Sequence, residues 1–252
     1  MEQGPLVRAV ADGPVTTLTL DSPANRNALS LGLLGELSSH LDALAAAPPR
    51  AVVVTGTGPA FSSGADLKAG TAAVAATPPA VAEVLDKLWA LPSPVVVALN
   101  GHVRAGGLGI VAAADVVVAP ATATFAFAEV RIGVVPAVVA VVCARRMAPR
   151  ALSRYTLAGE PFTAAEARDA GLVTIVVEPD EVAATTASLV EELTTAGPRA
   201  VAATKSLLRT LAPPIGPGMA EAAALSAEVF ASPEATEGIA AFAARRTPAW
   251  RS

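Results

Sequence analysis

The sequence predicts an α/β fold in which a layered first half is followed by a mainly helical second half. Short runs rich in valine and threonine alternate with helix-like segments up to residue 137. Beyond that residue, the apolar spacing is mostly that of helices. The chain has 252 residues, 53% of them hydrophobic, which is enough to bury one sizeable core.

The strands of the first half are short and separated by turn residues. Residues 15–20 (VTTLTL) alternate in hydrophobicity and are β-branched, which is typical of a strand. Residues 59–68 (PAFSSGADLK) are expected to form a loop. Continuous apolar runs predict further strands, several of them buried on both faces, at 51–58, 95–99, 115–120 and 124–127.

Leucines at helical spacing from Leu29 to Leu44 predict a helix that ends at Pro48. Thr163 and Glu166 fit a capping box, which marks another helix start. A strand is expected at 173–177. The remaining predicted helices span 80–91, 104–115, 150–158, 163–171 and 180–196, with two or three more between 198 and 246.

No linker rich in glycine and serine divides the chain, so one folded unit is expected. Residues 1–196 are interpreted as the α/β core. Residues 197–252 are interpreted as a C-terminal helical region that packs on the core and on neighbouring subunits, because exposed apolar faces generally mark contacts.

Composition excludes several classes of function. One cysteine, Cys143, rules out an internal disulfide and a cysteine-based zinc cluster, and two histidines argue against a histidine metal site. A net charge of -4 without a run of basic residues argues against nucleic-acid binding. No apolar run reaches the roughly 20 residues needed to cross a bilayer, and no secretory signal is evident. We therefore expect a soluble cytoplasmic protein without a metal.

Two segments, 52–68 and 95–115, have the same predicted order of elements: a buried strand, a loop with glycines, and a helix start. Helix starts expose unpaired N–H groups, and two of them converging on one oxygen would stabilise an oxyanion. For either loop alone, a simple tight turn is the more common explanation. Signatures of dinucleotide binding, of a P-loop and of a serine nucleophile elbow are missing.

Three segments resemble, in order, the three signatures of the crotonase (enoyl-CoA hydratase/isomerase) superfamily: FSSGADLK (61–68), NGHVRAGGLGIVAAAD (100–115) and FAFAEVRIGVVP (125–136). Residues 25–30, 157–177 and 242–250 are similar to further segments of that family. The resemblance implies a crotonase spiral of ββα units with C-terminal helices. It also implies an acyl-CoA substrate, no cofactor beyond the coenzyme A of that substrate, and a homotrimer or hexamer.

The resemblance also implies roles for single residues. The backbone N–H groups of Ala65 and Gly106 would bind the thioester oxygen. Coenzyme A would be bound by Arg26, Ala28, Ser63, Ala65, Asp66, Leu67 and Lys68, and by Arg245, often from a neighbouring subunit. For Arg26, Lys68 and Arg245, a solvated surface charge is the alternative interpretation.

Known hydratases of the family use two glutamates, and the matching positions here are Gly109 and Glu129. Glu129 lies in an apolar run, where a carboxylate is costly unless it is functional or paired. Burial would raise its pKa toward the range of a useful base. The structural alternative is a salt bridge with Arg131 or another arginine.

The sequence therefore favours an enoyl-CoA hydratase with a single catalytic glutamate, Glu129. The amino-acid sequences of the second and third signatures are similar to those of methylglutaconyl-CoA hydratase-like members. If this chain is of that kind, Gly109 would leave room for a branched or polar acyl chain. The same glutamate could instead serve a Δ3–Δ2 enoyl-CoA isomerase. An alternative of another class is an acyl-CoA-binding protein without turnover.

Three further residues have structural interpretations. Arg104 is expected to form a surface or inter-subunit ion pair, with contact to a substrate carboxylate as the alternative. His102 is expected to be a polar residue of the turn, and Cys143 a residue of the core.

Overall fold

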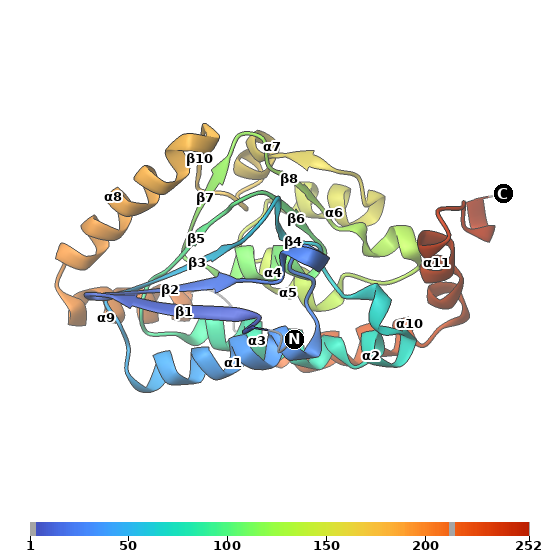
Figure 1. Cartoon of the computed structure of the whole chain (residues 1–252), viewed down its shortest axis with the longest axis horizontal. Helices are drawn as coiled ribbons and strands as arrows, with labels where there is room; N and C mark the ends of the chain where they lie inside the picture. The colour runs from blue at the N-terminus through green and yellow to red at the C-terminus, as the bar shows by residue number, and fades with distance from the viewer. Residues whose placement is uncertain (1–3, 212–214, 252) are drawn as a thin grey trace.

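Two β-sheets form the centre of the molecule (Figure 1), whose computed structural model describes residues 4–211 and 215–251. The larger sheet has the order β1-β2-β3-β5-β7-β10, and the smaller sheet has the order β4-β6-β8-β9. Pairing is parallel except for β1 with β2 and β8 with β9. The larger sheet contains Val7–Asp12 (β1), Val15–Leu20 (β2), Ala51–Gly56 (β3), Val95–Ala98 (β5), Val116–Pro120 (β7) and Ile175–Val177 (β10). The smaller sheet contains Ala60–Ser62 (β4), His102–Arg104 (β6), Thr124–Ala126 (β8) and Phe162–Thr163 (β9).

The chain repeats one unit three times: a strand in the large sheet, a strand in the small sheet, then helices. In each unit the small-sheet strand begins four residues after the large-sheet strand ends (56 to 60, 98 to 102, 120 to 124). After β4 come Leu67–Ala69 (η2), Thr71–Ala75 (α2) and Thr77–Ala90 (α3); after β6, Gly106–Ala113 (α4); after β8, Ala128–Ile132 (η3) and Ala137–Cys143 (α5). The carboxyl ends of β4, β6 and β8 therefore lie side by side.

Most predicted strands are confirmed, but the loop predicted at 59–68 is wrong because it contains β4 and η2. Neither β6 nor β1 was expected from the sequence. β4 and β6 have three residues each, too few to show an alternating pattern, and they are held by pairing with segments distant in sequence. β1 is exposed at every residue after Val7, so it has no buried face to set a pattern.

The helices begin and end close to the predicted residues. The leucine pattern forms Leu31–Ala46 (α1), where the Ser30 side chain accepts a hydrogen bond from the N–H of Leu33. The capping box of Thr163 and Glu166 is confirmed at the start of α7. The later helices are Pro149–Ala158 (α6), Ala164–Asp169 (α7), Val182–Thr195 (α8), Pro198–Leu211 (α9), Gly216–Phe230 (α10) and Pro233–Ala243 (α11), with short 3₁₀ turns at Pro23–Asn25 (η1), Pro179–Glu181 (η4) and Ala249–Arg251 (η5). Among the described residues, no helix is long and apolar enough to span a bilayer.

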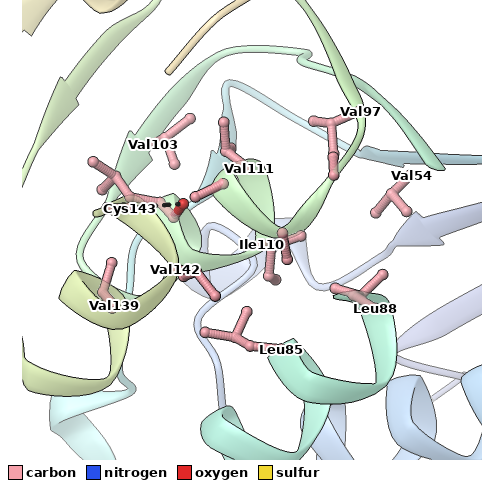
Figure 2. Packing of buried hydrophobic residues seen from close by; sticks show 14 of the residues in the cluster. Val54, Leu85, Leu88, Val97, Val103, Ile110, Val111, Val139, Val142 and Cys143 are labelled. Atoms are coloured by element: carbon pink, nitrogen blue, oxygen red, sulfur yellow. Dashed lines mark hydrogen bonds between the residues drawn. The ribbon is translucent and has the colours of Figure 1, made fainter. Parts of the chain in front are cut away.

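The core lies between the large sheet and helices α1, α3, α4 and α5, while α8 covers part of the opposite face of that sheet (Figure 1). Helix α4 is buried at every position after its first residue. Figure 2 shows Ile110 of α4 between Val54 and Val97 of the sheet and Leu85 and Leu88 of α3. A helix buried on all sides reads as uniformly apolar, which matches the sequence of this segment.

Gly109 allows α4 to approach α3 closely. A Cβ atom built on Gly109 would lie 2.6 Å from Cδ1 and 3.2 Å from Cδ2 of Leu85, whose side chain is fully buried. Glycine is costly in a helix interior, but here any side chain would meet Leu85. Close packing of α3 on α4 therefore depends on the missing side chain.

The predicted boundary between residues 196 and 197 falls between α8 and α9 and stays a prediction. Helix α9 is anchored to the core by Lys205, whose Nζ lies 2.6 Å from Oδ2 of Asp115 and donates to the carbonyl of Ser93 at 2.8 Å. The same carboxylate oxygen accepts a bond from the N–H of Val95 at 2.7 Å. The Lys205 side chain is 8% exposed and that of Asp115 is 29% exposed. The lysine is thus the more deeply buried partner, and burial lowers its pKa against the opposing effect of Asp115.

The unequal burial of this pair predicts unequal costs of breaking it. Asp115→Ala strands a buried ammonium and should lower the free energy of unfolding by about 3–5 kcal/mol. Lys205→Met leaves a partly solvated carboxylate that keeps the Val95 bond, and should cost only about 1–3 kcal/mol. Urea unfolding of both single variants and the double variant measures the difference. A larger loss from Lys205→Met than from Asp115→Ala would contradict this interpretation.

The contact between Gly109 and Leu85 gives a second prediction. Gly109→Ala should destabilise the protein by about 1–3 kcal/mol through overpacking, although alanine favours helices. Leu85→Val should relieve the clash, so the double variant should lose less than the sum of the single losses in urea unfolding. The control is Gly35→Ala in α1, where no atom lies within 4 Å of the added Cβ, and which should gain up to about 1 kcal/mol. Stabilisation by Gly109→Ala would contradict this prediction, because it would show that the Leu85 side chain can move away from the added Cβ at little energetic cost.

Candidate active site

A cavity opens beside the carboxyl ends of β4 and β6. One wall is formed by the loops after these strands, with Ala65 and Gly106, and by Leu29. Glu129 of η3 lies in the same cavity. The other lining residues come from the starts of α3 and α5 and from α10, which contributes Ser226 and Phe230. The three residues predicted to be catalytic therefore share one cavity.

Two segments predicted to contact coenzyme A, 25–30 and 61–68, are bound to each other by hydrogen bonds. The N–H of Leu29 donates to the carbonyl of Gly64 at 2.8 Å, and the N–H of Ser63 donates to that of Arg26 at 3.0 Å. The Ser62 hydroxyl donates to the carbonyl of Asn27 at 2.9 Å in the interior. These bonds fix the loop that carries Ala65.

The backbone N–H groups of Ala65 and Gly106 both remain without an acceptor among the described residues. Gly106 is the first residue of α4, where an N–H group has no intrahelical acceptor and the helix dipole is positive. The two loops touch, since a Cβ on Gly64 would lie 2.6 Å from the Cβ of Ala105. Gly64 has φ +85°, and Ala105 also has a positive φ of 47°, an uncommon conformation for a residue with a side chain. The backbone is thus shaped to bring two free donors to one cavity.

Glu129 is the acidic group of this cavity, and it is 8% exposed. Its Oε2 is buried without a hydrogen-bond partner among the described residues, and no described arginine or lysine pairs with it. The predicted alternative of a salt bridge with Arg131 is therefore wrong; Arg131 is exposed. Burial raises the pKa of Glu129 to about 7, against a smaller opposing effect of a backbone hydrogen bond. At neutral pH the carboxyl group can therefore both accept and donate a proton.

The expectation that Gly109 leaves room for the acyl chain is wrong. Gly109 is buried beneath the cavity wall and does not line the cavity. The space beside it is filled by Leu85, which Figure 2 shows next to α4. The position that carries a glutamate in paired-glutamate hydratases thus holds no carboxylate and no free volume here.

The other predicted coenzyme A residues lie around the loop after β4. Ala28 is buried beside Leu29, and Asp66 accepts a bond from the N–H of Lys68 at 3.2 Å, which caps η2. Ser63, Asp66 and Leu67 are half-buried, whereas Arg26 and Lys68 are exposed. Arg245 is exposed after the end of α11 and does not line the cavity. The roles of these residues stay predictions.

The structure shows the surroundings of three further residues, Arg104, His102 and Cys143, which have structural interpretations from the sequence. Arg104 donates to the carbonyl groups of Val103 and Thr124, at 2.9 and 2.6 Å, and forms no ion pair with a described residue of its own chain. Its predicted contacts with a neighbouring subunit or a substrate carboxylate stay predictions. His102 contacts the backbone and hydroxyl of Thr124 and is a polar residue of the turn, as expected. Cys143 is fully buried in the core, where burial and then Glu129 raise its pKa.

The walls contributed by α3, α5 and α10 were not predicted from the sequence. Thr77, Ser226 and Phe230 all line the cavity, and Phe230 also belongs to a buried apolar cluster. A buried serine on the apolar face of a helix was the available signal for Ser226. Among the described residues, no group of three or more histidine, cysteine, aspartate or glutamate side chains could hold a metal ion.

Known proteins resemble this chain over nearly its whole length. The model of the family described as enoyl-CoA hydratase/isomerase matches residues 11–252. The structure of an enoyl-CoA hydratase from Mycobacterium avium is 35% identical and has a TM-score of 0.88, covering 98% of this chain and 100% of that one. This similarity confirms the predicted crotonase α/β fold, with its two sheets and C-terminal helices.

Curated relatives give the same result at the level of sequence. The 2,3-dehydroadipyl-CoA hydratase of Escherichia coli is 33% identical over 242 residues, covering 93% of this chain and 94% of the relative. The carnitinyl-CoA dehydratase of Salmonella arizonae is 33% identical over 263 residues, covering 97% and 98%. With the matched family model and the shared fold, these similarities show that the chain is an enzyme of the enoyl-CoA hydratase/isomerase family, the crotonase superfamily.

Proposed function

We propose that this protein is an enoyl-CoA hydratase that adds water to the α,β-double bond of an acyl-CoA thioester, with Glu129 as its single acid–base group. The observation that carries the proposal is the shared cavity: Ala65, Gly106 and Glu129 all line it, the N–H groups of the first two lack an acceptor among the described residues, and Glu129 has no described cation as a partner. The relatives described above as hydratases support the reaction class.

The thioester oxygen accepts hydrogen bonds from the N–H groups of Ala65 and Gly106. These bonds strengthen as negative charge moves onto that oxygen, and each such donor contributes about 3–4 kcal/mol to transition-state stabilisation in comparable sites. The Glu129 carboxylate takes a proton from water while the water oxygen bonds to Cβ. A proton is then delivered to Cα, either from Glu129 or from water, so that the elements of one water molecule are added.

The coenzyme part of the substrate is assigned to the loops at the cavity mouth. In this proposal it lies along Arg26, Ala28, Ser63, Asp66, Leu67 and Lys68. Arg245 would meet its phosphates from a neighbouring subunit of a homotrimer or hexamer. The basic side chains are exposed, as contacts with a phosphate at the surface require.

An isomerase that moves the double bond from Δ3 to Δ2 is the second candidate. Among the described residues that line the cavity, Glu129 is the one ionisable side chain, and a single carboxylate can carry a proton from Cα to Cγ. The third candidate, a binding protein without turnover, is disfavoured because the chain belongs to a family of enzymes.

The methylglutaconyl-CoA subtype is not supported by the chemistry of the cavity. None of the residues that line it is lysine, arginine or histidine, so a second carboxylate on the acyl chain would have no cation to pair with there. An ionised Glu129 would also repel that group. We therefore propose an uncharged acyl chain as the substrate class.

Replacement of Glu129 tests the proposed reaction. Wild-type protein should hydrate crotonyl-CoA faster than it isomerises a 3-enoyl-CoA or hydrates 3-methylglutaconyl-CoA. Glu129→Gln should lower kcat/KM for crotonyl-CoA by about 10²–10⁴-fold while acyl-CoA still binds.

Because the base must be ionised, kcat/KM of the wild type should rise with pH and level off above the Glu129 pKa of about 7.

The control is Glu228→Gln, at an exposed position of α10, which should leave the rate unchanged. Unchanged hydration in Glu129→Gln would remove Glu129 from the mechanism. Faster turnover of the 3-enoyl-CoA would favour the isomerase, and binding without turnover of any substrate would favour the third candidate.

The raised pKa of Glu129 also predicts how stability depends on pH. Between pH 4.5 and about 7 the unfolded chain releases the Glu129 proton while the folded chain keeps it, so folding loses free energy as pH rises through this window. Glu129→Gln removes this loss, and its stability relative to wild type should increase by about 3 kcal/mol between about pH 5 and about pH 8. Urea unfolding at both pH values measures the change, and Glu228→Gln should show none. A constant difference would mean that the carboxyl group is well solvated.

A further inference from the structure

The cavity contains a second polar group without a partner, the hydroxyl of Ser226. Ser226 lies in the middle of α10, is 5% exposed and lines the cavity. Its hydroxyl forms no hydrogen bond with any described residue. It is also absent from the fully enclosed polar atoms that lack a partner in the described chain, so the oxygen is not sealed in the interior, and its residue lines the cavity.

A hydroxyl within a helix either points to solvent or bonds the carbonyl four residues earlier, and the buried Ser226 hydroxyl does not form that bond. Among the described residues, five helical hydroxyls outside the cavity form it, those of Ser39, Ser153, Thr156, Thr186 and Thr236. Thr77, the other hydroxyl residue that lines the cavity, donates to the carbonyl of Ala73 at 3.0 Å. Ser226 thus presents an unused donor and acceptor to a mostly apolar space.

The position of Ser226 indicates which part of a ligand it would meet. The thioester oxygen is assigned to Ala65 and Gly106, on the loops after β4 and β6. Ser226 comes from a different wall, where α10 packs against α3 and α5, together with Val81 and Val138. A ligand group that reaches Ser226 is therefore part of the acyl chain beyond the reacting carbons.

We propose that Ser226 determines substrate specificity by hydrogen bonding to a neutral oxygen, a hydroxyl or keto group, on the distal acyl chain. This inference rests on the proposed function, which places an acyl chain in the cavity. A neutral group is required because Ser226 carries no charge and the lining residues include no cation. A carboxylate would in addition face Glu129.

Binding of saturated acyl-CoA pairs tests this proposal without depending on turnover. The pairs are butyryl-CoA with 4-hydroxybutyryl-CoA, and hexanoyl-CoA with 6-hydroxyhexanoyl-CoA, measured by calorimetry. For at least one pair, Ser226→Ala should shift the ratio of the two Kd values by about three- to tenfold against the hydroxylated chain. Ser226→Thr, which keeps the hydroxyl, should preserve the wild-type ratio.

Thr77→Val is the matched control, because its hydroxyl lines the same cavity but is already bonded. This variant should leave the ratio unchanged. An unchanged ratio in Ser226→Ala for both pairs would overturn the inference while the proposed function stands. So would an equal loss of affinity for free coenzyme A, which would place Ser226 at the coenzyme instead. If no acyl-CoA binds to the wild type, the proposed function and this inference fail together.

Discussion

The cavity depends on the parallel register of β3, β5 and β7 in the large sheet. Val52 pairs with Val95, and Val96 pairs with Val116, so the three strands are in register with one another. Because each continues into the small sheet after the same number of residues, β4, β6 and β8 are also level. Ala65, Gly106 and Glu129 follow the ends of these three strands by three, two and three residues (62 to 65, 104 to 106, 126 to 129). A slip of one residue in this register would reverse the side-chain faces and separate the three groups.

The packing and hydrogen bonds around the cavity explain how a carboxyl group without a counter-charge is retained in the interior. Desolvation of Glu129 is unfavourable, and two loops adopt positive φ angles at Gly64 and Ala105. These costs are offset by the large apolar cluster that surrounds α4 (Figure 2) and by the hydrogen bonds that tie residues 25–30 to 61–65. No described lysine or arginine pairs with the carboxyl group, and two basic residues of the same region are placed otherwise: Arg131 is exposed, and Arg104 is bonded to backbone carbonyls.

The sequence contained the parts of this site that depend on local pattern. The buried valine strands, the leucines of α1 and the Thr163 capping box each depend on residues that are close together in the sequence. The glycine loops supported both the prediction of an oxyanion-binding site and the family resemblance. The three-residue strands β4 and β6 were missed because their hydrogen bonds join segments far apart in the chain. For the same reason, the sequence could show that Gly109 lacks a side chain but not that Leu85 fills its place. Likewise, nothing local to α10 revealed that Ser226 would line the same cavity as Glu129.

With Leu85 beside Gly109, the proposed mechanism assigns the proton transfers to Glu129, and geometry then favours one of the two candidate reactions, hydration or isomerisation. Hydration requires one carboxyl group to serve Cβ, through water, and Cα, which are one bond apart. Isomerisation requires the same group to serve Cα and Cγ, two bonds apart, so the group or the chain must move further. A carboxyl group fixed in a short 3₁₀ turn and enclosed by the core has little freedom for the longer transfer. Its pKa of about 7 supplies both protonation states at neutral pH, which a base that returns its proton to an adjacent carbon needs. Burial of this one side chain therefore supports both the choice of base and the choice of reaction.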